Sequence, residues 1–265
     1  MSTDFLWQNG EVVPAFSISP SRGRTASGFW LGDGVFETLL VENGSIFALR
    51  RHVERLHDAA GIVGVTTDWL DAAIGSGLDL AVKSLSGRTG QIRISLLSSG
   101  DCLIIGQVHE IPENALTLLL YPYPKNQDSI LAGVKTLSYG ENAHALRYAR
   151  ERGSDDVVFL NQRGEVSESA LANLLLFDGS RWWTPPLTSG VLPGVTRELL
   201  LSYFEVNERV ILRHDLGEMK AMALTSSLRD IQAVSKFEGD SYLALNEVDR
   251  LRADFQRWRR AKVDP

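Results

Sequence analysis

The chain has 265 residues, of which 44% are hydrophobic and 23% charged, so it can fold as one large globular domain or two smaller ones. Its net charge of -6 argues against nucleic acid or an anionic membrane as the main partner, because both require an excess of basic side chains. The single cysteine, Cys102, forbids an internal disulfide and fits a reducing compartment. With no leader-like start and no apolar run of membrane-spanning length, we expect a cytoplasmic protein.

The first 120 residues predict an α+β unit. Asn9-Gly10 supplies the positive φ that a tight hairpin turn requires, and a polar connector follows at residues 17–28. Apolar side chains at helical spacing predict one helix from Leu49 to Ala60 and another from Trp69 to Leu80, behind the N-cap candidate Thr67. The strands expected in this part are residues 5–8, 11–13, 35–41, 46–49, 91–97, 102–106 and 115–121.

A linker is predicted near the middle of the chain. Residues 121–128 (YPYPKNQD) combine prolines with polar side chains, a composition that resists both helix and sheet. We therefore predict a domain at 1–122, a linker at 123–133 and a second, larger domain at 134–265. In the second domain we expect strands at 156–160, 165–169, 174–177, 181–184, 209–212 and 222–226, and helices at 141–152, 196–204 and 241–261.

Lys135 and Glu168 are the pair of residues that most directly suggests a chemistry. Lys135 lies in GVKTLSY (133–139), and Glu168 follows in VSES (166–169). Pyridoxal 5′-phosphate enzymes need a lysine amine for the cofactor aldehyde and a carboxylate at the pyridine nitrogen. Taken alone, Lys135 is expected to be exposed, as lysine almost always is. The other five lysines are interpreted as solvated surface residues: Lys83, Lys125, Lys220, Lys236 and Lys262.

A phosphate seat is predicted where a Pro-Gly turn precedes a helix. In PGVTRELL (193–200), backbone N–H groups, the positive end of the helix dipole and the Thr196 hydroxyl favour an anion. An N-capped helix with no ligand is the plain alternative. Arg55, in HVERL (52–56), is either an exposed helix arginine or a guanidinium that clamps the phosphate.

The sequence segments described above occur in the same order as in a known protein family. The chain resembles the class IV aminotransferases, the fold-type IV pyridoxal phosphate enzymes, over roughly residues 5–235. That resemblance implies an α+β, two-domain, D-amino-acid-aminotransferase-like fold with the cofactor site between the domains. It rests on six segments: residues 32–38 (GDGVFET), 52–56 (HVERL), 134–137 (VKTL), 166–168 (VSE), 194–197 (GVTR) and 224–229 (LTSSLR).

The resemblance also implies roles for individual residues. Lys135 would form the Schiff base with the cofactor, and Glu168 would pair with the pyridinium nitrogen. Three further groups would hold the phosphate, and the family implies a homodimer in which loops of one subunit reach the site of the other. The protein groups expected to bind the phosphate are Arg55, the Val195 and Thr196 amides with the Thr196 hydroxyl, and Ser227.

Within the family, the chain resembles the 4-amino-4-deoxychorismate lyase branch most closely. Thr38 stands where the lyase form has a threonine near the lysine, whereas branched-chain aminotransferases usually have a glycine. Two departures are present: Ser98 replaces an arginine that grips a substrate carboxylate, and Ser138 replaces an asparagine common in lyases. Arg93 and Arg229 are the candidates to replace the missing arginine; the alternatives are that Arg93 points away from the site and that Arg229 only covers the surface.

Two alternatives to the lyase remain open at the level of sequence. A class IV aminotransferase of the branched-chain or D-amino-acid type is the runner-up to the lyase, and a non-catalytic protein with this fold is the third reading. A metal enzyme is disfavoured because the histidines show no paired ligand spacing of the His-Glu-x-x-His kind. A Ser-His-Asp hydrolase is disfavoured because no Gly-x-Ser-x-Gly elbow is present.

Overall fold

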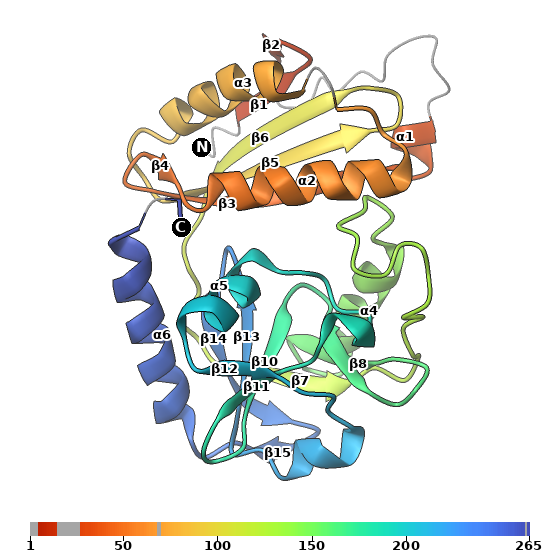
Figure 1. The fold of residues 1–265 in the computed structure, drawn as a ribbon, viewed down its shortest axis with the longest axis vertical. Helices are drawn as coiled ribbons and strands as arrows, with labels where there is room; N and C mark the ends of the chain where they lie inside the picture. The colour runs from red at the N-terminus through yellow and green to blue at the C-terminus, as the bar shows by residue number, and fades with distance from the viewer. Residues whose placement is uncertain (1–4, 15–26, 68–69, 263) are drawn as a thin grey trace. The chain divides into compact units, whose positions relative to one another are not determined.

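The computed structural model describes residues 5–14, 27–67, 70–262 and 264–265 (Figure 1). It divides into two compact units. Unit 1 comprises Met1–Glu110, Val134–Tyr139 and Ala261–Pro265, and unit 2 comprises Ile111–Gly133 and Gly140–Arg260. Each unit combines helices with a β-sheet, so the predicted α+β class is confirmed. Most of the predicted connector at 17–28, and the predicted helix residue Trp69, lie outside the described residues.

Unit 1 is built on a six-stranded sheet whose paired strands are all antiparallel, in the order β2-β1-β6-β5-β3-β4. The predicted hairpin at Asn9-Gly10 is confirmed by the pairing of β1 with β2. The elements are β1 (Phe5–Gln8), β2 (Glu11–Val12), α1 (Ser27–Trp30), β3 (Gly34–Glu42), β4 (Ser45–Ile46), α2 (Leu49–Val63), α3 (Leu70–Ser84), β5 (Gly90–Leu97) and β6 (Cys102–Val108).

The core of unit 1 lies between one face of this sheet and helices α2 and α3, both orange in Figure 1. Side chains alternate along a strand, so Val35, Leu39 and Val41 of β3 point into this core. They pack against helix residues such as Leu56 and Ile74, which are also buried. Phe36 and Thr38 therefore lie on the opposite face of the sheet, away from the helices.

Residues Val134–Tyr139 belong to unit 1, although the predicted second domain was to begin at 134. The backbone explains this: Phe36 N–H donates to the Lys135 carbonyl over 2.9 Å, and Leu137 N–H donates to the Gly34 carbonyl over 2.8 Å. A bridge between Val35 and Thr136 completes the pairing. The Lys135 segment is thus an added edge segment beside β3.

Unit 2 contains a nine-stranded mixed sheet in the order β12-β11-β10-β13-β14-β7-β8-β9, with β15 paired to β14. Helix α6, blue in Figure 1, packs against β13 and β14. The elements are β7 (Leu116–Leu120), α4 (Gly140–Arg150), β8 (Asp156–Leu160), β9 (Val166–Ser169), β10 (Asn173–Phe177), β11 (Trp182–Thr184), η1 (Leu187–Ser189), α5 (Val195–Tyr203), β12 (Val206–Glu208), η2 (Arg213–Gly217), β13 (Ala221–Ser226), β14 (Asp230–Phe237), β15 (Asp240–Ser241) and α6 (Leu245–Arg260).

Four details of the predicted elements differ from the structure. Strand β7 lies in unit 2 rather than with the first 120 residues, because it pairs in parallel with β8 and β14. Strand β14 was missed, since its buried polar residues, Asp230 and Gln232, obscure the apolar pattern. The strand predicted at 209–212 is instead Val206–Glu208, which pairs with β11. The closing helix begins at Leu245 rather than at 241.

In the described part of the chain, none of the helices has both the length and the apolar character needed to cross a membrane.

Gly34→Ala is expected to destabilise unit 1 and to displace the Lys135 segment. A Cβ at Gly34 would lie 2.2 Å from the Leu96 carbonyl oxygen and 2.9 Å from a Leu137 methyl carbon, so backbone must move. We expect a loss of at least about 1–3 kcal/mol in the free energy of unfolding by urea. Gly61→Ala is the matched control: it meets nothing within 4 Å and should stabilise α2 by up to about 1 kcal/mol. Equal stability of the two variants would contradict the close packing at Gly34.

Candidate active site

Lys135 lies on the face of the unit 1 sheet that the helices do not cover. Its Nζ is 4.4 Å from the centre of the Phe36 ring, and the Arg93 Cζ lies 3.7 Å from the same centre. Arg93 is the cross-strand partner of Thr38 in the pairing of β3 with β5, so the two share a face. Lys135, Thr38 and Arg93, three residues expected at the site from sequence, therefore gather around Phe36.

Neighbouring polar groups hold Arg93 in place. Its Nε donates to the Ser95 hydroxyl over 3.3 Å, and the edge of the Tyr139 ring meets the Phe36 ring at 5.4 Å between centres. Burial lowers the pKa of the Arg93 guanidinium from its ordinary value. Ser98 differs from Arg93 in its setting, because it is exposed in the turn after β5 and its N–H donates to the Asp33 carbonyl.

Arg55 lies on helix α2 and binds a carboxylate of its own unit. Its Nε and Nη2 donate to the two oxygens of Glu37 over 2.7 and 2.8 Å, a two-point pairing of guanidinium with carboxylate. His52 Nδ1 lies 2.7 Å from Glu37 Oε2, and it carries the hydrogen because a carboxylate only accepts. Sequence reasoning did not single out Glu37 or His52, although both lie inside the two motifs that it used.

Burial and charge act in opposite directions on this cluster. Burial would raise the pKa of the Glu37 carboxyl, but Arg55 and His52 outweigh burial and hold that pKa far below its ordinary value of 4.5. Burial, together with the positive charges of Arg55 and Lys135, lowers the pKa of His52 although Glu37 raises it, so the imidazole is neutral at pH 7. Glu37 is therefore a buried anion that fixes the orientation of the Arg55 side chain.

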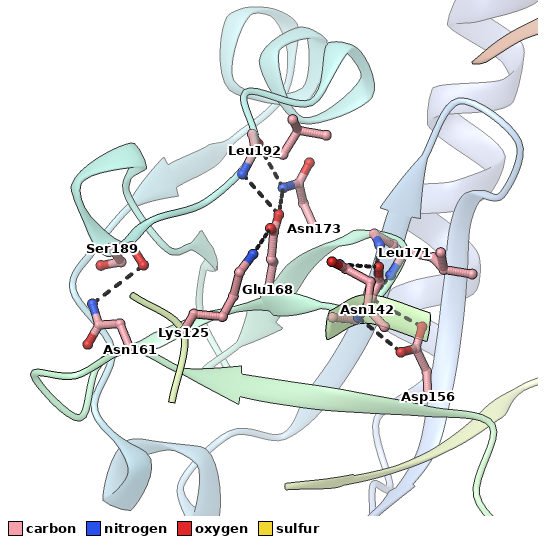
Figure 2. A network of polar contacts seen from close by, with 12 residues as sticks. Lys125, Asn142, Asp156, Asn161, Glu168, Leu171, Asn173, Ser189 and Leu192 are labelled. Carbon is pink, nitrogen blue, oxygen red and sulfur yellow. Dashed lines mark hydrogen bonds and ion pairs between the residues drawn. The ribbon is translucent and has the colours of Figure 1, made fainter. Parts of the chain in front are cut away.

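Glu168, in unit 2, is the acceptor of a second polar cluster, drawn in Figure 2. Its Oε1 accepts from Lys125 Nζ over 2.6 Å. Its Oε2 accepts from the Leu192 N–H over 2.9 Å and from Asn173 Nδ2 over 3.2 Å. The Asn173 amide also donates to the Leu192 carbonyl, so strand β9, strand β10 and the segment before α5 meet at this carboxylate.

Lys125 is not the solvated surface lysine that the sequence suggested. Its side chain is only 16% exposed and its Nζ lies over the Phe159 ring, 5.4 Å from the centre. Its backbone is fixed as well, because its N–H donates to the Leu160 carbonyl over 2.8 Å. The exposed prolines on both sides of Tyr123 gave the impression of a solvated connector, and no local pattern pointed to the partner in β9.

The predicted phosphate-binding site, at the start of helix α5, lies close to the Glu168 cluster in unit 2. Helix α5 begins at Val195, with Gly194 as N-cap and with no side-chain hydrogen bond to cap it. A Cβ at Gly194 would lie 2.0 Å from Asn173 Oδ1, so glycine is required for this approach. The N–H groups of the first turn, including those of Val195 and Thr196, have no acceptor within the helix itself.

Ser227 and Arg229 lie in the turn between β13 and β14. Asn173 pairs with Thr225 across β10 and β13, so this turn follows at the same end of the sheet as Asn173. Arg229 Nη1 donates to Gln232 Oε1 over 2.5 Å. Unit 2 therefore brings Glu168, the start of α5 and Ser227 to one end of its sheet.

Comparison with known proteins gives consistent matches across most of the chain. The family model described as "Amino-transferase class IV" matches residues 34–237. A Mycobacterium tuberculosis protein named bifunctional aminodeoxychorismate lyase / D-amino acid transaminase is 25% identical over 240 residues, 78% of this chain and 83% of that protein.

Solved structures show the fold. A hypothetical aminotransferase from Mycobacterium tuberculosis, in its PLP-bound form, is similar with a TM-score of 0.83 at 20% identity, covering 95% of this chain and 98% of that chain. The branched-chain aminotransferase from Thermoproteus uzoniensis with norvaline gives a TM-score of 0.84 at 20% identity, covering 97% and 94%.

Glu37→Gln is expected to cost about 3–5 kcal/mol of stability at pH 7, because it leaves the buried His52 and the largely buried Arg55 without their anion. The pH dependence has a definite sign. The folded-state pKa of Glu37 is depressed, so its contribution is complete above the ordinary value of 4.5 and is lost as pH falls below it. Urea unfolding between pH 3 and 7 should show a steeper acid loss for the wild type than for the variant, and parallel curves would contradict the depressed pKa.

Proposed function

The chain belongs to the class IV aminotransferases, a family that uses pyridoxal 5′-phosphate, and we propose that it converts 4-amino-4-deoxychorismate to 4-aminobenzoate and pyruvate for folate synthesis. The observation that carries this choice is the position of Thr38, which shares a sheet face with Arg93 and with the Phe36 ring beside Lys135. The name of the bifunctional relative from Mycobacterium tuberculosis includes the same lyase activity.

The donor groups of the two units suit this cofactor. Lys135 supplies an amine for the covalent link, and Glu168 supplies a buried carboxylate for the ring nitrogen. The first turn of α5 has no side-chain cap, so its N–H groups and the Thr196 hydroxyl suit a phosphate. Arg55 and Ser227 are the further phosphate ligands that we propose. Glu37 would hold the guanidinium of Arg55 in a fixed orientation.

The reaction requires two proton transfers by groups of unit 1. The bound cofactor supplies a ring that takes up the charge left when the substrate carbon bearing nitrogen loses its proton. Lys135 takes that proton, because its amine becomes available once the substrate amine replaces it. The Thr38 hydroxyl relays a proton toward the enolpyruvate oxygen as it leaves. Arg93, held by Ser95, binds a substrate carboxylate.

An amino-acid aminotransferase of the branched-chain or D-amino-acid type is the second candidate. It is favoured by the exposed Ser98, which stands where an arginine would bind a substrate carboxylate. The solved branched-chain aminotransferase has the same fold, and the bifunctional relative is also named as a D-amino acid transaminase. The homodimer expected from the family resemblance stays a prediction.

Incubation of the cofactor-loaded protein with 4-amino-4-deoxychorismate is expected to release pyruvate and 4-aminobenzoate in equal amounts, measured by a lactate dehydrogenase assay and by chromatography. An amino-donor screen run in parallel should show no comparable conversion of the cofactor to its amine form. Absence of both products, together with conversion by an amino acid that a 2-oxo acid reverses, would replace the lyase with the aminotransferase.

Thr38 offers a control within the same assay. We expect Thr38→Val to lower the rate of pyruvate release by about 10²–10⁴-fold, the usual contribution of a positioned proton donor, while cofactor binding is unchanged. Thr38→Ser keeps the hydroxyl and should retain most of the activity. If Thr38→Val released pyruvate at the wild-type rate, the role of the hydroxyl would be wrong.

A further inference from the structure

The ion pair between Lys125 and Glu168 has no role in the reaction proposed above, yet it occupies the carboxylate intended for the cofactor's ring nitrogen. The Lys125 ammonium is 2.6 Å from Glu168 Oε1, and both side chains are largely buried. Lysine is rarely buried unless it is paired, so a lysine in this position has been placed against Glu168 rather than left in solvent.

We propose that Lys125 is a positioning residue that sets how strongly Glu168 stabilises the protonated form of the cofactor's ring nitrogen. The proposal rests on the function proposed above, because it takes Glu168 as the partner of that nitrogen. Lys125 acts through Glu168 and forms no bond to the substrate. Its positive charge partly neutralises the carboxylate, which then stabilises the protonated ring less strongly than an unpaired carboxylate does.

Glu168 has room for both partners. An ionised carboxylate offers about four acceptor positions. Among the described residues, three donors use them: Lys125 Nζ at Oε1, and the Leu192 N–H and Asn173 Nδ2 at Oε2 (Figure 2). One acceptor position remains at Oε1, beside the ammonium, and the ring nitrogen would bind there. The protonated ring nitrogen and the Lys125 ammonium would therefore both contact Glu168 Oε1.

The structure fixes Lys125 in this position. The Leu160 carbonyl accepts from its N–H, a parallel bridge pairs it with Asn161, and its Nζ lies over the Phe159 ring. An exposed ion pair is screened by water and contributes little, but the Lys125 and Glu168 side chains are only 16% and 10% exposed. The charge of Lys125 is therefore felt strongly at the carboxylate.

No other charged side chain in the described residues contacts this carboxylate. Glu165, immediately before the same strand, is turned to Asn161, Ser189 and Arg163. Asp156, on the neighbouring strand, accepts from Ser169 and from backbone N–H groups. Asn173 and the Leu192 N–H are neutral. Lys125 is thus the residue whose charge can be changed without altering another ion pair of Glu168.

The test follows the protonation of the ring nitrogen directly, by nitrogen NMR of the holoenzyme loaded with cofactor labelled with ¹⁵N at that position. Lys125→Gln keeps a hydrogen-bond donor but removes the charge, and Lys125→Met removes both. In each variant the pH at which the ring loses its proton should rise by about one unit or more relative to the wild type, as expected when a neighbouring cation is removed.

Two controls separate charge from structure. Lys125→Arg keeps the charge, so its midpoint should stay within a few tenths of a pH unit of the wild type. Lys236→Met removes the same charge from an exposed site on β14 and should leave the midpoint unchanged. A merely structural role for Lys125 predicts altered thermal unfolding with an unchanged midpoint, and that result would overturn the proposal.

The outcomes also distinguish this proposal from the function on which it rests. If the wild type binds no labelled cofactor, both are overturned. If the wild type binds it and the midpoints of Lys125→Gln and wild type coincide, only the role of Lys125 is wrong. Should Lys125→Met fail to fold, Lys125→Gln gives the same comparison, because it preserves the donor that the buried Glu168 requires.

Discussion

The buried carboxylate of Glu168 is the interaction on which the arrangement of unit 2 depends. An anion taken out of water must be matched by donors, and here they come from three separate stretches of chain: Lys125, Asn173 and the backbone at Leu192. Asn173 also packs against Gly194, where helix α5 begins. The contacts that compensate the buried charge therefore also fix the carboxylate relative to the N-terminal end of helix α5, where we propose that the cofactor phosphate binds.

Unit 1 follows the same rule with a different anion. Glu37 is buried on the helix side of β3 and binds Arg55 and His52, while the neighbouring residues Phe36 and Thr38 point to the other face. One strand therefore orients a guanidinium on one side and the surroundings of Lys135 on the other. Gly34 permits this by letting the backbone of β5 and the Leu137 side chain approach β3 closely. The chemistry that we propose needs both faces of that strand.

Local patterns predicted much of this, because hairpin turns, helical spacing and strand alternation depend on neighbouring residues. The hairpin at Asn9-Gly10 and most strand positions are confirmed for that reason. The features that were predicted wrongly are determined by partners that are distant in the sequence. Strand β14 was missed because its buried polar residues bind across the fold, as Gln232 does to the Asn114 carbonyl. Lys125 looked solvated between prolines, and only the strand carrying Glu168 explains why it is buried. The roles of Lys135 and Glu168 were accessible from motif order alone and stay proposals.

The identity of the lysine that holds the cofactor tests the account most directly, since Lys125 and Lys135 are both candidates by chemistry. Protein loaded with pyridoxal 5′-phosphate is reduced with borohydride, digested with trypsin and mapped by mass spectrometry. Attachment at Lys135 blocks cleavage there and gives a labelled peptide spanning residues 126–147. The account predicts that peptide. A labelled peptide spanning residues 94–135, with the modification on Lys125, would contradict it.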